Sequence, residues 1–430
     1  MDYSDNIAII GSGIAGMEAS LMLSKAGKKV TLIEKLSLIG GKTIKNEETF
    51  PSLDCSTCLV APIQQEILQD GNINVHTVSE VSKISGNAGN FKVEINKKAR
   101  YVNLEACLGC GACYPVCPIS QMNEWEENLT KKKAIYVPCS GSLPNVPVID
   151  ADKCLNLSGQ EDCKKCEEAC MFGAIDFTEK DEKIELKAGA ILAATGYDLL
   201  DVSSMENLGY GELLEVYTAM EFERLFAENG PTEGKLVMRD GETIPSSVAI
   251  IHCVGRSETN YCSNVCCTAS SKHAHFIHHK LADAKVYNIY SDICLPDKTY
   301  QKFHQDVKEN SSKFIYQSDK DKMKITKKQG KINIKYLDNK DETQDLKVDM
   351  VILANALIPA KGSDELAKVL GVKQDRFGFI EAQPFRVGSV NTSKTGIFVA
   401  GCIEGPKDIQ NSVIQSEAAV AGILSLLKDK

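Results

Sequence analysis

The sequence predicts an α/β fold made of two parallel-sheet units, with a cysteine-rich insert interrupting the first unit. Three observations predict it. A strand, a glycine-rich turn, a helix and a second strand follow one another over residues 6–34. A second buried strand ending in glycine occupies residues 248–255, and eight cysteines in two runs separate the two regions. Alternating strands and helices typically form a parallel sheet covered by helices.

The composition is that of a soluble globular chain, because 43% of its 430 residues are hydrophobic and 25% are charged. This length accommodates two or three domains. No apolar run approaches the roughly 18 residues that span a bilayer, and residues 1–5 lack the pattern of a signal peptide. We therefore expect a cytoplasmic location. The net charge of −9 does not favour binding to nucleic acid.

The first motif is a G-x-G-x-x-G turn between an apolar strand and a helix. Its glycines permit a tight turn, backbone approach to a pyrophosphate, and close packing of helix on strand. The pyrophosphate would lie at the helix N-terminus, and the acid that ends the second strand would bind ribose hydroxyls. The alternative is a glycine-rich turn in another α/β unit, and the motif alone does not distinguish FAD from NAD. The predicted contacts are Gly11, Ser12, Gly13, Ile14, Ala15, Gly16, Glu34 and Lys35.

The next segment adds a glycine pair and a cysteine pair. Gly41 and Lys42 belong to a turn that would bring the chain back towards the nucleotide. Cys55 and Cys58 form a C-x-x-C pair, which could be a redox dithiol, two metal ligands or two structural thiols. Alternating strands over residues 73–97, with Val81 as a predicted cofactor contact, continue the nucleotide-binding domain.

Cysteines are unusually frequent, with 17 in the chain, and they are clustered. In a reducing compartment such clusters favour metal or redox chemistry over disulfides. They also indicate an anaerobic or low-potential setting. The composition changes near residue 99, where the region with the most cysteines begins.

Two cysteine runs within residues 99–180 have the spacing of a two-cluster bacterial ferredoxin, apart from eight residues between Cys154 and Cys163 where two are usual. In this pattern the last cysteine of each run binds the other cluster. We therefore predict two [4Fe–4S] clusters, with zinc as the alternative. One takes Cys107, Cys110, Cys113 and Cys170, and the other takes Cys154, Cys163, Cys166 and Cys117. Cys139 lies outside both runs and is predicted to be a buried thiol.

The nucleotide-binding fold is predicted to resume near residue 182. Residues 184–197 are predicted to form a strand pair that ends in a turn containing Thr195 and Gly196, both candidate cofactor contacts. Residues 217–226 have the pattern of a helix. Residues 313–336 are predicted to form an antiparallel meander, and residues 348–355 another buried strand.

The strand over residues 248–255 leads into a turn where thiols replace a glycine-rich phosphate cradle. Four cysteines at this strand end and turn suggest a third [4Fe–4S] site, and the alternative is two buried structural thiols with an exposed pair. The predicted ligands are Cys253, Cys262, Cys266 and Cys267. A helix follows over residues 268–282, and its four histidines are predicted to be surface or packing residues. Cys294 could be a spare ligand, which one cysteine does not decide.

These motifs together resemble the HdrA-type subunits of heterodisulfide reductases and the related QmoA subunits. The matching stretches are residues 53–58, the cysteine-rich insert, 221–224 with 230–234, 262–267 with 272–274, and 401–408. The resemblance implies one FAD in a thioredoxin-reductase-like fold, connected to [4Fe–4S] clusters. It also implies partner subunits of the HdrB/HdrC or QmoB/QmoC kind, with electron donor and acceptor proteins. The chain itself would not span a membrane, although partners could hold it at one.

The resemblance also assigns individual residues. Glu223 corresponds to a residue near the isoalloxazine ring in flavin-bifurcating members. A C-terminal segment that contacts FAD ribitol in such flavoproteins contains Gly401, with Cys402 where aspartate is usual and Asp408 as a substitute. Bifurcating members carry a lysine after the position of Pro384. This chain has Phe385 and Arg386 there, so we expect no bifurcation.

The sequence therefore predicts an electron-transferring FAD and iron–sulfur oxidoreductase subunit. The alternatives are a stand-alone NAD(P)H-dependent disulfide or thiol reductase that uses Cys55 and Cys58, and a redox sensor or scaffold without enzymatic activity. The predicted domains are an FAD-binding domain in three parts, a ferredoxin insert and a second dinucleotide-domain-like unit with the third cluster. In chain order they occupy residues 1–98 (FAD), 99–180 (insert), 181–240 (FAD), 241–360 (second unit) and 361–430 (FAD).

Overall fold

The computed structural model describes residues 5–384 and 388–428. Phe385 and Arg386, on which the expectation about bifurcation depends, lie outside the described residues. The chain forms two compact units. Unit 1 comprises residues 1–44, 57–197 and 359–430, and unit 2 comprises residues 45–56 and 198–358. The chain passes between the units within β12 (Tyr197–Leu199) and β21 (Leu357–Pro359) and at the two ends of residues 45–56.

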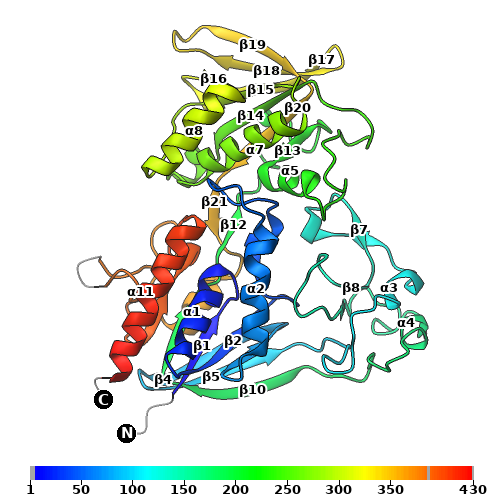
Figure 1. Cartoon of the computed structure of the whole chain (residues 1–430), viewed down its shortest axis with the longest axis vertical. Coiled ribbons are helices and arrows are strands. Elements are labelled where there is room, and N and C mark those ends of the chain that lie inside the picture. Colours follow the sequence, from blue (N-terminus) through cyan, green and yellow to red (C-terminus); the bar gives the residue numbers. More distant parts are fainter. Residues whose placement is uncertain (1–4, 385–387, 429–430) are drawn as a thin grey trace. The chain divides into compact units, whose positions relative to one another are not determined.

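Unit 1 is built on a five-stranded parallel sheet in the order β22-β11-β1-β2-β3, of which β1 and β2 are labelled in Figure 1. Its strands are nearly continuous apolar runs, as expected where both faces of a parallel sheet are covered. Ile7 pairs with Val30 on one side and with Ala190 on the other. The strands are β1 (Asn6–Ile10), β2 (Lys29–Ile33), β3 (Ile73–His76), β11 (Ala190–Ala193) and β22 (Ile397–Val399).

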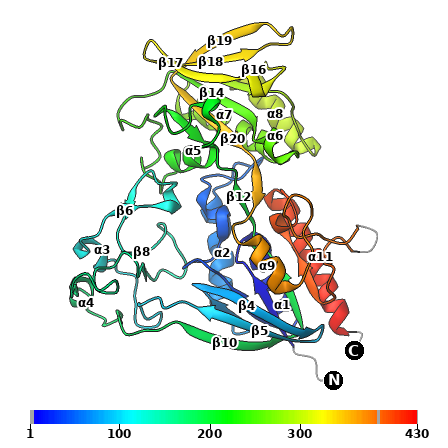
Figure 2. The same cartoon turned by 180° about the vertical axis from the view of Figure 1, so that it is seen from behind.

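Helices cover one face of this sheet, and a second sheet covers the other. On the first face, side chains of α1 (Ile14–Lys25) and α11 (Ile409–Lys428) share one core, which includes Met17 and Ile423. Helix α2 (Ser56–Gln69) lies beside α1 (Figure 1). On the second face, a three-stranded antiparallel sheet and α9 pack against the strands (Figure 2). These elements are β4 (Ser79–Asn87), β5 (Asn90–Lys97), β10 (Glu182–Ala188) and α9 (Ser363–Leu370).

The two strands predicted over residues 184–197 are present, but they do not pair with each other. Strand β10 pairs antiparallel with β5, whereas β11 lies between β1 and β22 in the parallel sheet. The reason is that Gly189, between the two strands, donates its N–H to Asn6 O, so the chain moves from one sheet into the other at this residue.

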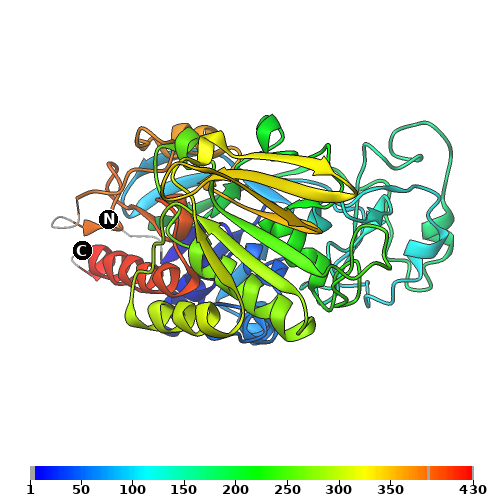
Figure 3. The same cartoon turned by 90° about the horizontal axis from the view of Figure 1, so that it is seen from above.

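The cysteine-rich insert lies between β5 and β10 and has little regular structure. In Figure 3 it is the cyan-to-green region at the far end from the red helix α11. Its own small core includes Val102, Ile135 and Ile175 together with several of its cysteines. Its elements are α3 (Cys113–Val116), α4 (Lys165–Glu168), β6 (Gln121–Met122), β7 (Lys131–Lys132), β8 (Ile135–Tyr136), β9 (Val148–Ile149) and the 3-10 turn η2 (Glu124–Glu126).

Unit 2 contains a second five-stranded parallel sheet, in the order β13-β20-β14-β15-β16. The strands are β13 (Val216–Thr218), β14 (Ser247–Val254), β15 (Lys285–Tyr290), β16 (Lys313–Tyr316) and β20 (Met350–Asn355). Its helices are α5 (Ala219–Phe226), α6 (Arg256–Thr259), α7 (Cys266–Lys280) and α8 (Lys298–Asn310). The helices predicted over residues 217–226 and 268–282 correspond to α5 and α7. Further 3-10 turns in the chain are η1 (Gly41–Lys45), η3 (Glu206–Leu208), η4 (Lys320–Lys322) and η5 (Gly401–Ile403).

The meander predicted over residues 313–336 is only partly correct. Strand β16 pairs parallel with β15, because helix α8 connects the two and returns the chain to the same end of the sheet. The antiparallel sheet begins one strand later, with β17 (Lys324–Lys328), β18 (Lys331–Leu337) and β19 (Thr343–Val348). Residues 198–240 also belong to unit 2, since β13 pairs with β20, whereas the sequence placed them with the FAD-binding domain.

Between residues 5 and 384 and between 388 and 428, no helix combines the length and apolarity needed to cross a membrane.

Candidate functional site

The glycine-rich turn of unit 1 is closed on one side and open on the other. Gly11 has φ +100°, and a Cβ there would lie 2.5 Å from Ala194 O. A Cβ on Gly16 would lie 2.0 Å from Gly11 O, so helix and strand pack too closely for any other residue. A Cβ on Gly13 would meet no atom within 4 Å, and no side chain caps the N-terminus of α1 there. Open space therefore lies before the first turn of α1, whose N–H groups are not capped by any side chain among the described residues, and this is the arrangement that binds a phosphate.

Glu34 lies at the end of β2 beside this turn and is only 7% exposed. Its Oε2 accepts hydrogen bonds from the Ser12 N–H (2.9 Å) and hydroxyl (2.7 Å), and its Oε1 accepts one from the Leu36 N–H (2.8 Å). Lys35 is exposed. The buried carboxylate is thereby held in one position at the turn, where its charge disfavours an additional phosphate.

Two other segments border the turn. Gly41 packs on it, since a Cβ at Gly41 would lie 2.7 Å from Gly13 Cα. Lys42 donates from Nζ to Tyr197 O at 2.5 Å. The Thr195 hydroxyl is buried and has no hydrogen-bond partner among the described residues, while a Cβ on Gly196 would meet open space. A buried hydroxyl of this kind is commonly satisfied by a bound group, so the surroundings of the turn fit a dinucleotide.

The remaining predicted contacts of unit 1 lie on other elements. Val81 is half-buried at an irregularity in β4. A Cβ on Gly401 would lie 3.2 Å from the Ala15 Cβ, which places the C-terminal return against α1. Cys402 is buried, and burial raises the pKa of its thiol. Asp408 caps α11, because its Oδ1 accepts the Asn411 N–H at 2.7 Å.

The structure brings the cysteines of the two runs together as two groups of four. One cavity is lined by Cys107, Cys110, Cys113 and Cys170. A second cavity is lined by Cys117, Cys154, Cys163 and Cys166. Each group therefore combines three cysteines of one run with the last cysteine of the other. Cys154 joins its group in spite of the long spacing to Cys163.

Backbone N–H groups point at sulfurs of the first group. Gly109 N lies 3.4 Å from Cys107 Sγ, and Ala174 N lies 3.3 Å from Cys170 Sγ. Gly109 has φ +68°, and a Cβ there would collide with Asn145. Burial raises the pKa of Cys113 to about 12. Binding of a metal cluster, which requires thiolates, would therefore release a proton from this side chain.

Arg100 connects the insert to the parallel-sheet domain within unit 1. It is buried and donates to Val146 O and Ser37 O (both 2.8 Å) and to Thr77 Oγ1 (2.7 Å). Burial lowers its pKa to about 10. Nothing in the sequence marks this arginine, because its partners are mostly carbonyl oxygens far away in the chain.

The third cysteine group lies at the carboxyl end of β14 in unit 2. Cys253 has φ +59° and lies at a register shift between β14 and β20. A non-glycine residue with positive φ is energetically unfavourable, and such residues are enriched at functional sites. A cavity of about 280 Å³ lies next to this end of β14. Five cysteines line it, namely Cys253, Cys262, Cys266, Cys267 and Cys294. Cys294 is thus a member of this group.

Single-ion sites are a separate question. Among the described residues, no three His, Cys, Asp or Glu side chains are close enough to hold one metal ion. The cysteines of the three groups instead line three cavities.

Glu223 is buried in unit 2 and has three polar partners. It accepts hydrogen bonds from Lys272 Nζ (2.7 Å), His273 Nε2 (2.7 Å) and Glu47 N (2.9 Å). Burial alone would raise its pKa, but Lys272 and His273 lower it to about 2. The charged carboxylate is therefore retained in a closed environment. His273 was expected to be a surface or packing residue, whereas here it is an internal hydrogen-bond donor.

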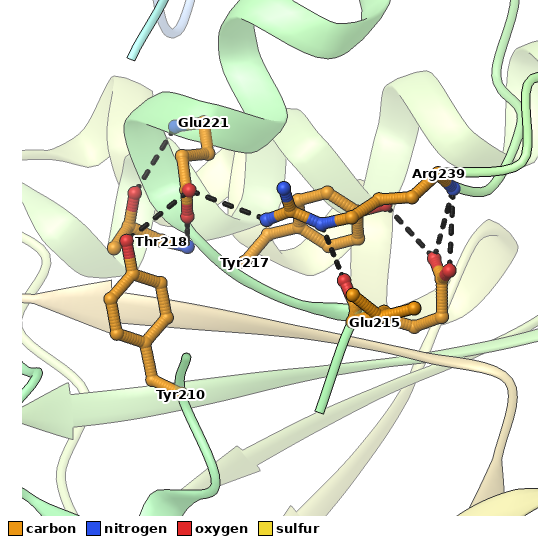
Figure 4. A network of polar contacts seen from close by, with 7 residues as sticks. Tyr210, Glu215, Tyr217, Thr218, Glu221 and Arg239 are labelled. Atoms are coloured by element: carbon orange, nitrogen blue, oxygen red, sulfur yellow. Dashed lines mark hydrogen bonds and ion pairs between the residues drawn. The ribbon is translucent and has the colours of Figure 1, made fainter. Parts of the chain in front are cut away.

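A second polar network holds the helix that carries Glu223 (Figure 4). Thr218 caps α5, since its Oγ1 accepts the Glu221 N–H (3.2 Å) and its own N–H donates to Glu221 Oε2 (2.7 Å). Arg239 lies over the Tyr217 ring and bonds both Glu221 and Glu215. These contacts fix the first turn of α5.

Cys55 and Cys58 lie at the start of α2 and are both exposed. Cys55 belongs to unit 2 and Cys58 to unit 1. Their chemical role remains a prediction.

Comparisons with known proteins place this chain in a family. A pyridine nucleotide-disulphide oxidoreductase family model matches residues 3–113. The HdrA-type iron–sulfur subunit of a CoB–CoM heterodisulfide reductase from Methanocaldococcus jannaschii is 37% identical, over 98% of this chain and 64% of the relative. An HdrA-like heterodisulfide reductase protein from Archaeoglobus profundus is 34% identical, over 99% of this chain and 67% of the relative. The chain belongs to the HdrA family of heterodisulfide reductase subunits.

Family membership confirms the resemblance inferred from the motifs. The fold is confirmed as well. Thioredoxin reductase from Lactococcus lactis superimposes with a TM-score of 0.54 at 15% identity, covering all of both chains, so this HdrA-family chain has the thioredoxin-reductase-like fold. The chain spans about 64% of the length of several curated relatives that it matches and about half of others.

Proposed function

We propose that this chain transfers electrons between FAD and [4Fe–4S] clusters within a heterodisulfide-reductase-type complex. The observation that supports the proposal best is the grouping of cysteines. Twelve of the seventeen were assigned from sequence to three sets of four, and each set lines one cavity. The match to an oxidoreductase family model and the relative named as an iron–sulfur subunit are both consistent with the proposal.

The glycine-rich turn of unit 1 would hold the FAD. The N–H groups after Gly13 would bind the pyrophosphate, and Glu34 would accept hydrogen bonds from ribose hydroxyls. Thr195, whose hydroxyl lacks a partner among the described residues, would donate to the cofactor. Bound flavin supplies the exchange between one-electron and two-electron steps. Simple electron transfer without bifurcation is the form we propose.

The cysteine groups would hold the clusters. The two groups of the insert would each bind one [4Fe–4S] cluster, and Cys253, Cys262, Cys266 and Cys267 a third. The N–H groups of Gly109 and Ala174 would donate to ligand sulfurs, which stabilises the reduced cluster and raises its potential.

Partner subunits of the HdrB/HdrC or QmoB/QmoC kind would exchange electrons with the insert. Apolar side chains are exposed around the first cavity, with Leu108 69% and Met171 86% accessible. The flanking residues 103–117 and 164–173 contain three acids, Glu105, Glu167 and Glu168, and two bases, Lys164 and Lys165. An apolar centre with a charged rim suits a redox partner whose rim carries complementary charges.

The alternative, an NAD(P)H-dependent disulfide reductase that uses Cys55 and Cys58, is less well supported. The relatives are named as heterodisulfide reductase subunits. The turn after β14, where a nicotinamide nucleotide would need a phosphate cradle, carries cysteines instead.

Anaerobic purification with cofactor analysis tests the proposal. We expect FAD absorbance, about twelve irons per chain and paramagnetic signals on reduction, since each cubane holds four irons. Absence of flavin, or clearly fewer than about eight irons, would contradict it. Rapid reduction of the flavin by NADH or NADPH without partner proteins would favour the alternative.

A further inference from the structure

The cavity at the end of β14 contains one more thiol than a cubane cluster uses. Five cysteines line it, and a [4Fe–4S] cluster takes four thiolates. Cys294 is the additional one. It follows β15, the parallel neighbour of β14, and the carboxyl ends of parallel strands meet at one edge of a sheet. This topology places Cys294 beside Cys253 and the start of α7, although it is 27 residues beyond Cys267.

The contacts of Cys294 differ from those of the other four cysteines. Its Sγ donates to Asn264 Oδ1 at 2.8 Å, so this thiol is positioned as a protonated donor. Its backbone N–H donates to Cys267 Sγ at 3.4 Å, and its thiol also interacts with Cys262. Asn264, which accepts from Cys294, donates its own N–H to Cys262 Sγ at 3.4 Å. Cys294 is therefore linked to the Cys262 and Cys267 side of the cavity.

We propose that Cys294 is a reserve ligand of the third cluster, able to replace Cys262. The inference rests on the proposed function, which supplies that cluster. In the exchange, the iron–sulfur bond to Cys262 breaks and one to Cys294 forms. The proton of the Cys294 thiol ends on the Cys262 sulfur, and no electron moves. Asn264 contacts both side chains and so connects the incoming and the outgoing sulfur.

Cys294 is placed to replace Cys262 and not Cys253. Cys253 comes from β14, and its Sγ lies 3.8 Å from Asp292 O. Cys294 is instead linked to Cys262 through Asn264, which accepts from the Cys294 thiol and donates its N–H to Cys262 Sγ. Arg256 hydrogen-bonds Cys253 and has a Coulombic interaction with Cys294, but among the described residues no side chain hydrogen-bonds to both cysteines. Replacement of Cys262 should therefore be tolerated by the cluster, and replacement of Cys253 should not.

Iron counting in alanine variants of the full chain tests the inference. We expect about twelve irons per chain in the wild type, in Cys262→Ala and in Cys294→Ala, and about eight in Cys253→Ala and in Cys262→Ala/Cys294→Ala. The paramagnetic signal of the third cluster should shift in Cys262→Ala, because one ligand has changed. Flavin content and the circular dichroism spectrum establish that each variant is folded.

Two results would overturn the inference, and they are distinguishable. If the wild type holds about twelve irons and Cys262→Ala only about eight, Cys294 cannot replace Cys262 while the proposed function stands. If the folded wild type itself holds about eight irons with flavin, the third cluster of the proposed function is absent, and the reserve ligand with it.

Discussion

Lys272 Nζ lies 2.7 Å from Glu223 Oε1, and both side chains are almost completely buried. Lys272 also donates to Glu48 O at 2.8 Å, and His273 completes the environment of the carboxylate. A buried charge is tolerable only when it is paired and hydrogen-bonded. The pair therefore links α5, α7 and the segment of residues 45–56 within unit 2.

Breaking this pair should destabilise unit 2 strongly. We expect Lys272→Met to lower the free energy of unfolding by about 3–5 kcal/mol, because it leaves the Glu223 carboxylate buried without its cation. Urea denaturation measures the change. The combined variant Lys272→Met/Glu223→Gln should be less destabilised than the sum of the two single changes.

Lys280→Met provides the matched control on the same helix. Its exposed pair with Glu228 (3.2 Å) should contribute at most about 1 kcal/mol. Equal losses for Lys272→Met and Lys280→Met would contradict the structural role of the buried pair.

The same carboxylate should make unit 2 sensitive to acid. The pKa of Glu223 is lowered from 4.5 to about 2, so the folded state binds its proton less readily than the unfolded chain does. Its stabilisation is fully present above pH 4.5 and is lost as the pH falls towards 2, to a total of about 3 kcal/mol.

Urea midpoints at several pH values between about 6 and 3 measure this effect. Wild type should lose more stability over that range than Glu223→Gln, which has no group to titrate at this position. Parallel curves for the two proteins would show that Glu223 does not titrate as the geometry requires.

A methyl group at Gly13 should weaken flavin binding without unfolding unit 1. Its Cβ would enter the open space before α1, where the pyrophosphate is proposed to bind. We expect Gly13→Ala to reduce FAD affinity at least about tenfold, roughly 1.4 kcal/mol. Flavin retention after gel filtration and titration of the apoprotein measure it.

Gly71→Ala is the corresponding control, because its Cβ would also meet open space but far along the chain from the turn. It should retain flavin like the wild type. If Gly13→Ala binds FAD normally, the cofactor does not lie against this turn.

The exposed apolar side chains around the first cavity should control electron exchange with partners. We expect Met171→Glu to slow transfer to a native partner about tenfold, by adding charge where both surfaces must desolvate. Stopped-flow oxidation of the reduced protein by the partner measures the rate, and the iron content should not change.

Leu214→Glu alters a similarly exposed apolar side chain (72% accessible) in unit 2 and should leave the rate unchanged. Similar slowing in both variants would indicate a general effect of charge rather than docking at the insert.

Several features could be inferred from local sequence because short segments specify them. The run from Asn6 to Glu34 predicted a strand, turn, helix and strand, and the structure has β1, α1 and β2 there. The cysteine spacing of the insert predicted two interlocked sets, which line two separate cavities. In both cases the residues that interact are close in sequence or follow a repeating pattern.

Strand pairing was less predictable. The sequence of β16 resembles that of the antiparallel strands after it, and only its connection through α8 makes it parallel to β15. Similarly, β10 and β11 are adjacent in sequence and belong to different sheets. Hydrophobic alternation reports which face of a strand is buried, but it does not report which strand lies beside it.

By itself the sequence indicated the family, the glycine-rich turn and which cysteines line each of the two insert cavities, since glycine and cysteine spacing reflects local backbone geometry. Only the tertiary structure decided that Lys272 and His273 pair with Glu223, that Arg100 anchors the insert, and that Cys294 joins the third cavity. The physical reason is common to all three. Each contact joins side chains from elements that are distant in the chain, and sheet order and helix packing bring them together.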